Sequence, residues 1–384
     1  MDFAFTPLQQ QRYDQMIAFS QQHLHDDSLP QRDRDSQFCN DRWMACARQG
    51  VLSMNVPAAY GGASEQPCLI SSVLAMEGLG YGCNDNGLLL GIAAQMWSVQ
   101  EPILHFGSET QKQSLLPRLC DGRWKACHAI TEPNAGSDVF SMQCAATRVN
   151  DGFRLSGTKH LVTLAPIADI AIVFAATDPD KGRWGVTAFI VRLNDENVET
   201  SANVEKMGLR TVPLGSIHLR DCHVSDADIL GSVGGGFSVF QHSLELERCF
   251  IMATQIGRMR RQLEETIQFA KTREQFGQPI GKFQSVSHRI AEMQLRLETS
   301  QLLLYKLAWL KSQGQSAMRQ AALLKLHLSE SFLENSMDAI RIHGGRGYLA
   351  DHDSQRDLRD ALGGVMYGGT SDVQRNLIAG LAGV

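Results

Sequence analysis

An acidic residue interrupts an apolar stripe in the segment HSLELERCF, residues 242–250. The stripe steps by four, three and four residues through Phe240, Leu244, Glu247 and Ile251. On a helix these positions share one face, which would turn toward the core. A carboxylate there must be desolvated, paired or functional, and a desolvated carboxylate is a strong general base. Glu247 is therefore a candidate functional carboxylate, and the alternative is a structural ion pair with a buried arginine such as Arg248 or Arg346.

Two other segments are rich in small residues and hydroxyl groups. In ITEPNAGSD, residues 130–138, Thr131 and Ser137 are the natural donors to a polar ring edge or a phosphate, and the small residues let backbone amides approach a ligand closely. The alternative is a surface turn with Asx chemistry. In GTKHLVT, residues 157–163, Thr163 ends a strand from which its hydroxyl could face the same pocket.

Two segments place an arginine or a group of glycines at the end of a helical pattern. In TREQFGQPIGKFQ, residues 272–284, Arg273 either compensates the helix dipole or grips a pyrophosphate with its planar fork. In RIHGGRGY, residues 341–348, glycines either allow a dinucleotide close to the backbone or end a helix. These glycines are Gly344, Gly345 and Gly347. The second segment is not a Rossmann fingerprint, because it follows a helix rather than a strand.

The elements that must position these residues fall into a helical, a β and a second helical region. The regions span residues 1–122, 123–231 and 232–384. The first has a pattern for four to six helices, with a break at GYGCNDNG, residues 80–87. The second has short β-type runs such as IADIAIVFAAT and WGVTAFIVRL, separated by turn residues.

The third region has the pattern of a helical bundle. It follows the glycine-rich segment LGSVGGGF, and a last helix begins near Ser371. The long helical patterns span about 237–271, 283–312 and 316–343. The sequence therefore predicts an α+β protein in which a β domain lies between two helical domains.

Composition limits the classes of partner. A chain of 384 residues with 43% hydrophobic and 20% charged residues can bury several sizeable cores. The net charge of -5, without runs of lysine or arginine, argues against nucleic acid or an anionic membrane as a partner. The nine cysteines lack the close pairs of a zinc site and indicate reduced thiols in a cytoplasmic protein without a metal. Neither a signal peptide nor a membrane span is expected.

Four segments together resemble the acyl-CoA dehydrogenase superfamily along essentially the whole chain. They occur in that family's order and at its usual separations, and they are TEPNAGSD, REQFG, RIHGGRGY and GGTSDVQRN. The resemblance implies a helical N-terminal domain, a middle β-barrel and a C-terminal four-helix bundle, with FAD between them. It also implies a homodimer or a homotetramer built as a dimer of dimers.

The resemblance further implies which residues hold FAD. Those lining the flavin within one subunit would be His128, Thr131, Gly136, Ser137, Leu161 and Thr163. Those near its pyrophosphate and adenosine would be Arg341, Gly344, Gly345, Thr370 and Asp372. Those reaching the FAD of the neighbouring subunit would be Arg273, Phe276 and Gln284.

The activity implied by the resemblance is removal of a proton next to a thioester carbonyl, with hydride delivery to flavin N5. In many members the base is the glutamate of a YEGT stretch, but here that stretch reads YGGT and Gly368 cannot serve. A second solution, in the isovaleryl and long-chain branches, places the base on the first long helix of the C-terminal domain. Glu247 matches that position, immediately before Arg248. The substrate-binding residues would then be Arg248, Ser137 and Gly368.

The sequence departs from the family pattern at three cofactor positions. Leu161 stands where many members carry a stacking aromatic residue, Arg341 replaces a glutamine, and Asp372 stands where Glu or Gln is usual. Arg341 could bring a second cation to the pyrophosphate. The overall texture is similar to the branch that oxidises prolyl or other acyl groups held on carrier proteins in secondary metabolism.

The leading hypothesis is an FAD-dependent α,β-dehydrogenase of an acyl thioester, carried by coenzyme A or by a phosphopantetheine carrier protein. Electrons would leave to an electron-transfer flavoprotein or to oxygen. One alternative is a flavin monooxygenase of the same fold, for which a base at Glu247 is unnecessary. Another is a non-catalytic member that binds flavin or thioester as a scaffold.

Overall fold

The N-terminal region is helical, as predicted. The computed structural model describes residues 5–384 and begins with α1. The α-helices of this region are α1 (Pro7–His23), α2 (Leu29–Arg34), α3 (Asn40–Arg48), α4 (Leu69–Gly82), α5 (Asn86–Gln95), α6 (Glu101–Phe106) and α7 (Glu109–Cys120). Within residues 5–122 the prediction of four to six helices was too low, because α2 and α6 have only six residues each and give little periodic signal. The predicted break at residues 80–87 separates α4 from α5.

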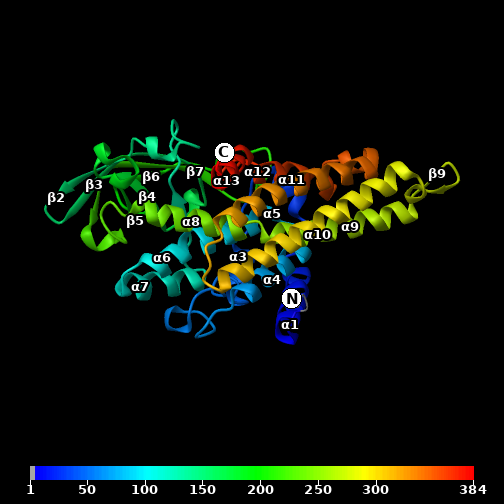
Figure 1. Ribbon diagram of the computed structural model, residues 1–384, viewed down its shortest axis with the longest axis horizontal. Coiled ribbons are helices and arrows are strands. Elements are labelled where there is room, and N and C mark those ends of the chain that lie inside the picture. The colour runs from blue at the N-terminus through cyan, green and yellow to red at the C-terminus, as the bar shows by residue number, and fades with distance from the viewer. Residues whose placement is uncertain (1–4) are drawn as a thin grey trace.

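The middle region forms one sheet of eight strands, drawn at the left of Figure 1. Its strands are β1 (Ala126–Ala129), β2 (Ala145–Val149), β3 (Gly152–Thr163), β4 (Ile170–Ala176), β5 (Val186–Arg192), β6 (Val198–Thr200), β7 (Leu214–Ser225) and β8 (Ile229–Leu230). The order is β6-β7-β3-β2-β4-β5-β8, and β1 pairs with β4 in parallel. The two runs named from the sequence, IADIAIVFAAT and WGVTAFIVRL, contain β4 and β5, so the β character of this region is confirmed.

The C-terminal region is again helical. Its helices are α8 (Gly236–Phe250), α9 (Ala253–Thr272), α10 (Gln284–Ser312), α11 (Met318–His343), α12 (Asp353–Gly364) and α13 (Ser371–Ala382). The single long helix expected at 237–271 is wrong, because the chain turns at Ile251 and Met252 between α8 and α9. Helices α9, α10 and α11 extend as an arm to the right in Figure 1. The arm ends in the small hairpin of β9 (Glu274–Gln275) and β10 (Gln278–Pro279).

Close packing of α4 against α9 joins the N-terminal region to the arm. A Cβ atom at Gly80 would lie 1.7 Å from the Thr254 carbonyl oxygen, and one at Gly257 would lie 1.9 Å from the Glu77 carbonyl oxygen. Only glycine permits this approach of two backbones. The two helices therefore form a rigid joint beside the first turn of the arm.

An apolar core holds α8 against the sheet and α6. Phe174 of β4, Ile103 of α6 and Val239 of α8 are fully or almost fully buried within it. Phe174 and Phe240 meet edge to face at 6.1 Å, so aromatic contacts fix the first half of α8 on the sheet. This packing leaves the second half of α8 to carry Glu247.

Three further features of the described residues concern membrane spans, metal ligands and cysteines. None of the described helices combines the length and apolar content that a membrane span requires. Within residues 5–384 no three His, Cys, Asp or Glu side chains are grouped so as to hold a metal. All nine cysteines are free thiols, and most are buried.

Candidate active site

Glu247 is partly buried on α8 and, within the part of the chain that the structure describes, its side chain makes a single hydrogen bond. Its Oε2 accepts from the Ser98 hydroxyl at 2.9 Å. Within residues 5–384 it forms no ion pair, so neither Arg248 nor Arg346 neutralises it by direct contact. The structural ion pair weighed as the alternative from the sequence is therefore not observed. The carboxylate keeps free acceptor capacity, which a general base requires.

Ser98 reaches Glu247 from a π-helical turn, Met96–Gln100, between α5 and α6. Such turns insert an extra residue into a helix and often occur at functional sites. The Ser243 hydroxyl lies 3.4 Å from the Ser98 carbonyl oxygen, to which it donates, and 3.2 Å from His128 Nε2 on β1. Polar contacts thus connect Glu247 with the strand that leads into the TEPNAGSD segment.

Gly368 lies directly opposite Glu247. Its φ of +63° is in the left-handed region, and a Cβ atom there would lie 3.2 Å from Glu247 Oε1. The same Cβ position is 3.6 Å from Cε of Lys325, a residue of α11. The side-chain position at 368 is therefore bordered by the candidate carboxylate and by Lys325, which is not among the residues predicted from the sequence.

Burial controls the electrostatics of the site. Desolvation raises the pKa of the Glu247 carboxyl above its ordinary value, although the Ser98 hydrogen bond and the charges of Arg248 and Lys325 act in the opposite direction. Desolvation lowers the pKa of the Arg248 guanidinium, whose Nε is buried without a hydrogen-bond partner. Burial lowers the pKa of His128 to about 4, so this imidazole is neutral at physiological pH. The site combines an unusually basic carboxylate with two nearby cations.

The hydroxyls predicted to face the flavin make no hydrogen bonds to the part of the protein that the structure describes. Within residues 5–384 the side chains of Thr131, Ser137 and Thr163 make no hydrogen bond, and Gly136 has open space where a side chain would be. The Thr131 carbonyl accepts from the His160 amide at 2.8 Å, which holds the start of the TEPNAGSD segment against β3. Free hydroxyl and amide donors beside a fixed strand fit the polar edge of a flavin.

A buried ion pair supports the same turn from behind. Lys159 is fully buried, and its ammonium lies 2.7 Å from Oε1 of Glu132. Glu132 also accepts hydrogen bonds from the backbone amides of Gln143 at 2.6 Å and Cys144 at 3.0 Å. The ion pair fixes the backbone between Thr131 and β2 from the buried side, and the exposed side of the TEPNAGSD segment stays uncovered by it.

Leu161 has a strained backbone at the predicted flavin position. Its φ is +53° and its side chain is 52% exposed, where β3 shifts register against β7. A left-handed conformation is unfavourable for a branched residue by roughly 1–2 kcal/mol, and such strain clusters at ligand sites. An exposed apolar side chain held in this way fits contact with a bound ring.

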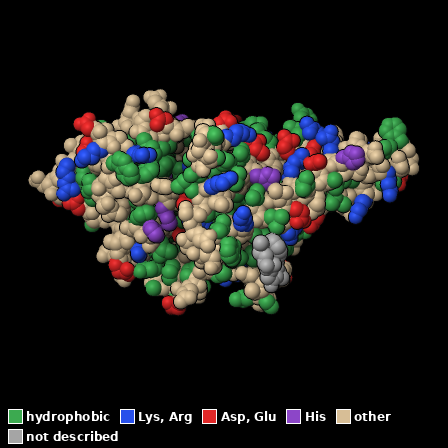
Figure 2. Space-filling view, viewed as in Figure 1, with side chains coloured by type: hydrophobic (Ala, Val, Ile, Leu, Met, Phe, Trp, Pro, Cys, Tyr) green, Lys and Arg blue, Asp and Glu red, His purple; other side chains and the backbone are tan. Residues whose placement is uncertain are grey.

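A second group of predicted cofactor residues lies at the far end of the arm. Arg273 and Gln284 are exposed, and Phe276 is 94% exposed with φ of +52°. Figure 2 shows hydrophobic atoms at this end of the molecule. Arg341 lies at the end of α11 and pairs with Asp338 at 3.2 Å.

The glycines after α11 also belong to the arm. The ring of His343, immediately before Gly344 and Gly345, stacks on Phe269 of α9 with centroids 4.5 Å apart. The sequence predicts that these glycines and Arg341 lie near the pyrophosphate and adenosine of FAD. In the structure they lie beside the end of α9, which Arg273 directly follows.

The remaining predicted residues lie at the start of α13. The Thr370 hydroxyl accepts from the Val373 amide at 3.2 Å and caps the helix. Asp372 pairs with Arg375 at 2.9 Å. Both residues therefore have structural contacts, and the helix N-terminus still presents amide donors.

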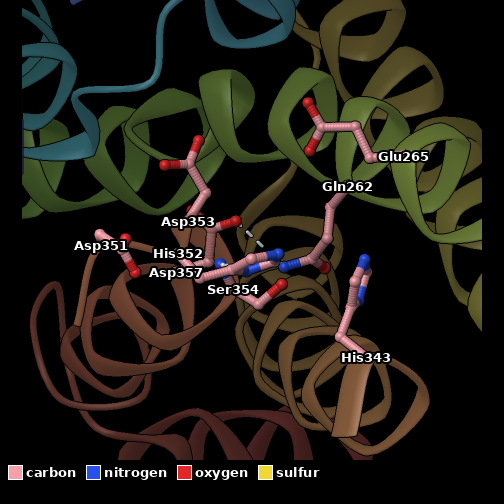
Figure 3. Close-up of a pocket in the computed structure, with 8 residues that line it drawn as sticks. All are labelled: Gln262, Glu265, His343, Asp351, His352, Asp353, Ser354 and Asp357. Carbon is pink, nitrogen blue, oxygen red and sulfur yellow. Dashed lines mark hydrogen bonds between the residues drawn. The ribbon is translucent and has the colours of Figure 1, made fainter. Parts of the chain in front are cut away.

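A separate cavity of about 310 Å³ lies between α9, the end of α11 and α12, as Figure 3 shows. Its lining residues include Gln262, His343 and Asp357. Asp357 is already bound by Arg258 at 2.9 Å and by Gln262 at 3.1 Å. None of its lining residues was predicted as catalytic, and the polar groups at its base serve to join helices.

Comparison with known proteins agrees with this arrangement. Residues 6–123, 127–222 and 234–381 match the N-terminal, middle and C-terminal domains of acyl-CoA dehydrogenase, respectively. An L-prolyl-(peptidyl-carrier protein) dehydrogenase of Pseudomonas fluorescens is 41% identical over 343 residues, covering 89% of this chain and 90% of its own.

Two solved structures have the same fold. The prolyl acyl carrier protein oxidase AnaB is 42% identical, with a TM-score of 0.97 over 99% of this chain and 100% of its own. PigA with FAD and proline is 34% identical, with a TM-score of 0.96 over 100% of this chain and 99% of its own. The three domains, the free donors beside β3 and these relatives lead to one conclusion: the chain belongs to the acyl-CoA dehydrogenase family, as an FAD-dependent oxidoreductase that acts on CH–CH bonds.

Proposed function

We propose that Glu247 is the base that removes the α-proton of an acyl thioester. The observation that carries this assignment is the contact with Gly368, because the carboxylate lies against a residue without a side chain and, among residues 5–384, has only the Ser98 hydroxyl as a direct hydrogen-bond partner. A carboxylate that served only the fold would be fully paired at this depth. Bound FAD supplies the acceptor for the hydride that leaves the β-carbon.

The other residues of the site position the substrate and hold the charge that develops. Gly368 leaves room for the thioester against Glu247, and Arg248 brings a cation beside the base. Ser137 is exposed within the TEPNAGSD segment, and its hydroxyl makes no hydrogen bond to the residues that the structure describes. Ser98 orients the carboxylate by its hydrogen bond of 2.9 Å.

We infer that the acyl group is a prolyl or similar small cyclic group held on a carrier protein. Two relatives with 41% and 42% identity are named for prolyl groups on carrier proteins, and PigA is described with proline bound. Electrons would pass to an electron-transfer flavoprotein. A 33% identical relative of Acetobacterium woodii is named as a subunit of a caffeyl-CoA reductase-Etf complex.

The two groups of predicted cofactor residues support a homodimer or homotetramer. His128, Thr131 and Leu161 belong to the β domain, whereas Arg273 and Phe276 lie at the opposite end of the molecule (Figure 1). One FAD cannot reach both groups in a single chain. We propose that each cofactor lies between the β domain of one subunit and the arm of another, which includes Arg341, Gly344 and Gly345. The nine free thiols support a reducing compartment, the cytoplasm.

The test is anaerobic bleaching of the flavin by a panel of thioesters. The panel contains prolyl and short acyl groups, each on coenzyme A and on a phosphopantetheine carrier protein, with wild type and Glu247→Gln. We expect rapid bleaching by the carrier-bound prolyl thioester and its loss in the variant. Bleaching only by coenzyme A thioesters would overturn the carrier assignment, and unchanged bleaching in Glu247→Gln would overturn the base. No bleaching by any thioester would favour oxygenation or a scaffold.

A further inference from the structure

A lysine is buried on the other side of the space at Gly368. Lys325 of α11 is 0% exposed, and its Cε lies 3.6 Å from the position of a Cβ atom at 368. Glu247 Oε1 lies 3.2 Å from the same position. The two side chains thus border one small space from two different helices.

The contacts of Lys325 do not neutralise its charge. The ammonium donates to the Gly364 carbonyl oxygen at the end of α12 and lies 5.5 Å from the centroid of the Tyr367 ring. Among residues 5–384 it forms no ion pair with a carboxylate. A buried ammonium without a counterion is unfavourable, so a purely structural role would be served better by an apolar side chain of similar length.

A second lysine in this part of the fold, Lys311, does have a carboxylate partner. Lys311, at the end of α10, pairs with Glu245 of α8 at 2.9 Å. Lys325 has only Glu247 as a nearby acid that favours its charged form, apart from a weaker effect of Glu330. Burial lowers the pKa of Lys325 to about 8, which leaves it mostly protonated at neutral pH.

We propose that Lys325 is a positioning residue that keeps Glu247 ionised, and therefore able to accept a proton, before the substrate binds. This inference rests on the proposed function of Glu247. The field of a cation across a dry space favours the carboxylate over the carboxylic acid. The charged or titratable groups that act on Glu247 are Arg248 on α8 and Lys325 on α11, and Glu247 in turn acts on Tyr367 before α13. Ser98 on the π-turn is a neutral donor to the carboxylate.

Arg248 also favours the ionised carboxylate but cannot replace Lys325. It follows Glu247 directly in the chain and so points about 100° away around the helix. Lys325 is the cation that borders the space at Gly368 together with the carboxylate. Removal of Lys325 should therefore change the protonation of Glu247 while Arg248 stays in place.

The test uses the flavin-loaded enzyme and the pH dependence of thioester-driven bleaching. In Lys325→Gln, which keeps a donor for the Gly364 carbonyl, we expect the acid limb of the rate profile to move up by about one pH unit. The rate on the acid side would fall about tenfold and would recover at higher pH. Lys325→Arg should retain the wild-type profile, and Lys311→Met is the matched control that should also leave it unmoved.

The outcomes separate this inference from the proposed function. An unmoved acid limb in Lys325→Gln would show that the lysine serves only the fold and would overturn the inference. A uniform loss of rate at every pH would overturn it too, because a shift in protonation is lost at high pH. Full activity of Glu247→Gln would instead contradict the assignment of Glu247 as the base. If Lys325→Gln does not retain flavin, Lys325→Met is measured in the same way with the same expected shift.

Discussion

Glu77 and Glu247 are both carboxylates held inside helical packing, and their surroundings differ. Glu77 on α4 is 0% exposed and accepts hydrogen bonds from Tyr305 at 2.5 Å and Gln301 at 2.8 Å, with Arg260 at 3.4 Å. Glu247 accepts a hydrogen bond from the Ser98 hydroxyl and borders Gly368, which has no side chain. Burial raises the pKa of both carboxyls.

The comparison shows that burial alone does not identify a reactive group. The carboxylate of Glu77 is paired with a cation of α9 and accepts hydrogen bonds from side chains of α10. The residue therefore joins α4 to these two helices. The charge of Glu247 is influenced by cations at a distance and leaves lone pairs free. A carboxylate that is desolvated but incompletely satisfied can exchange a proton with a ligand, whereas a satisfied one stabilises the fold.

The largest expected effect comes from Glu247→Gln. The amide has almost the same shape but cannot accept the proton, so the rate of substrate-driven flavin reduction should fall about 10²- to 10⁴-fold. Stopped-flow absorbance of the anaerobic enzyme measures this rate. Glu245→Gln, two residues away and paired with Lys311, is the matched control and should keep most of the activity. An equal loss of rate in both variants would contradict the assignment of Glu247, rather than Glu245, as the base.

The variant Glu77→Ala is expected to lose stability while it keeps its rate of flavin reduction. Removing this carboxylate takes the acceptor from the Tyr305 hydroxyl and the carboxylate partner from Arg260, which should reduce the free energy of unfolding by roughly 3 kcal/mol. The rate per bound flavin should stay close to wild type. Thermal or denaturant unfolding and flavin titration separate the two readouts, with Glu199→Ala in the exposed pair with Arg220 as control. Unchanged stability would contradict the structural role.

A smaller effect on both readouts is expected from Gly368→Ala. The left-handed backbone at φ of +63° disfavours alanine by about 1 kcal/mol, and the new methyl group would press on Glu247 Oε1. We expect flavin reduction to slow about tenfold through displacement of the base. Gly383→Ala, at φ of +86° with open space around it, is the control for backbone strain alone. Equal activity of the two variants would show that the space at 368 is not used.

The smallest expected effect comes from Ser98→Ala. The hydroxyl favours the ionised carboxylate, so its loss raises the pKa of Glu247 further and moves the acid limb of the rate profile to higher pH. The hydrogen bond is worth about 1 kcal/mol, which corresponds to a shift of less than about one pH unit. The direction follows because a higher pKa means that less of the base is ionised at a given pH. Flavin reduction rates across the acid range measure it, and a shift to lower pH would contradict this role.

Much of the fold and part of the site were predictable from sequence. The apolar stripe around Glu247 and the turn glycines are local signals, whereas the contact between Gly368 and the carboxylate joins two distant parts of the chain. Ser98 was missed because it lies in an apolar run whose π-turn leaves no periodic signal. Lys325 was missed although a lone lysine in the apolar run AALLKLHL is a detectable anomaly. Its neighbours come from Gly364, Tyr367 and α8, and such distant contacts cannot be derived from spacing alone.

The π-turn at Met96–Gln100 lies within one continuous helical run from α5 to α6. Such a turn holds one residue more than an α-helical turn does, and the extra residue is taken up within that single wide turn. The helical residues before and after it therefore keep the relative rotation of a helix that is one residue shorter. Ser98 can thus reach Glu247 on α8 from this turn without a change in the register of α5 or α6.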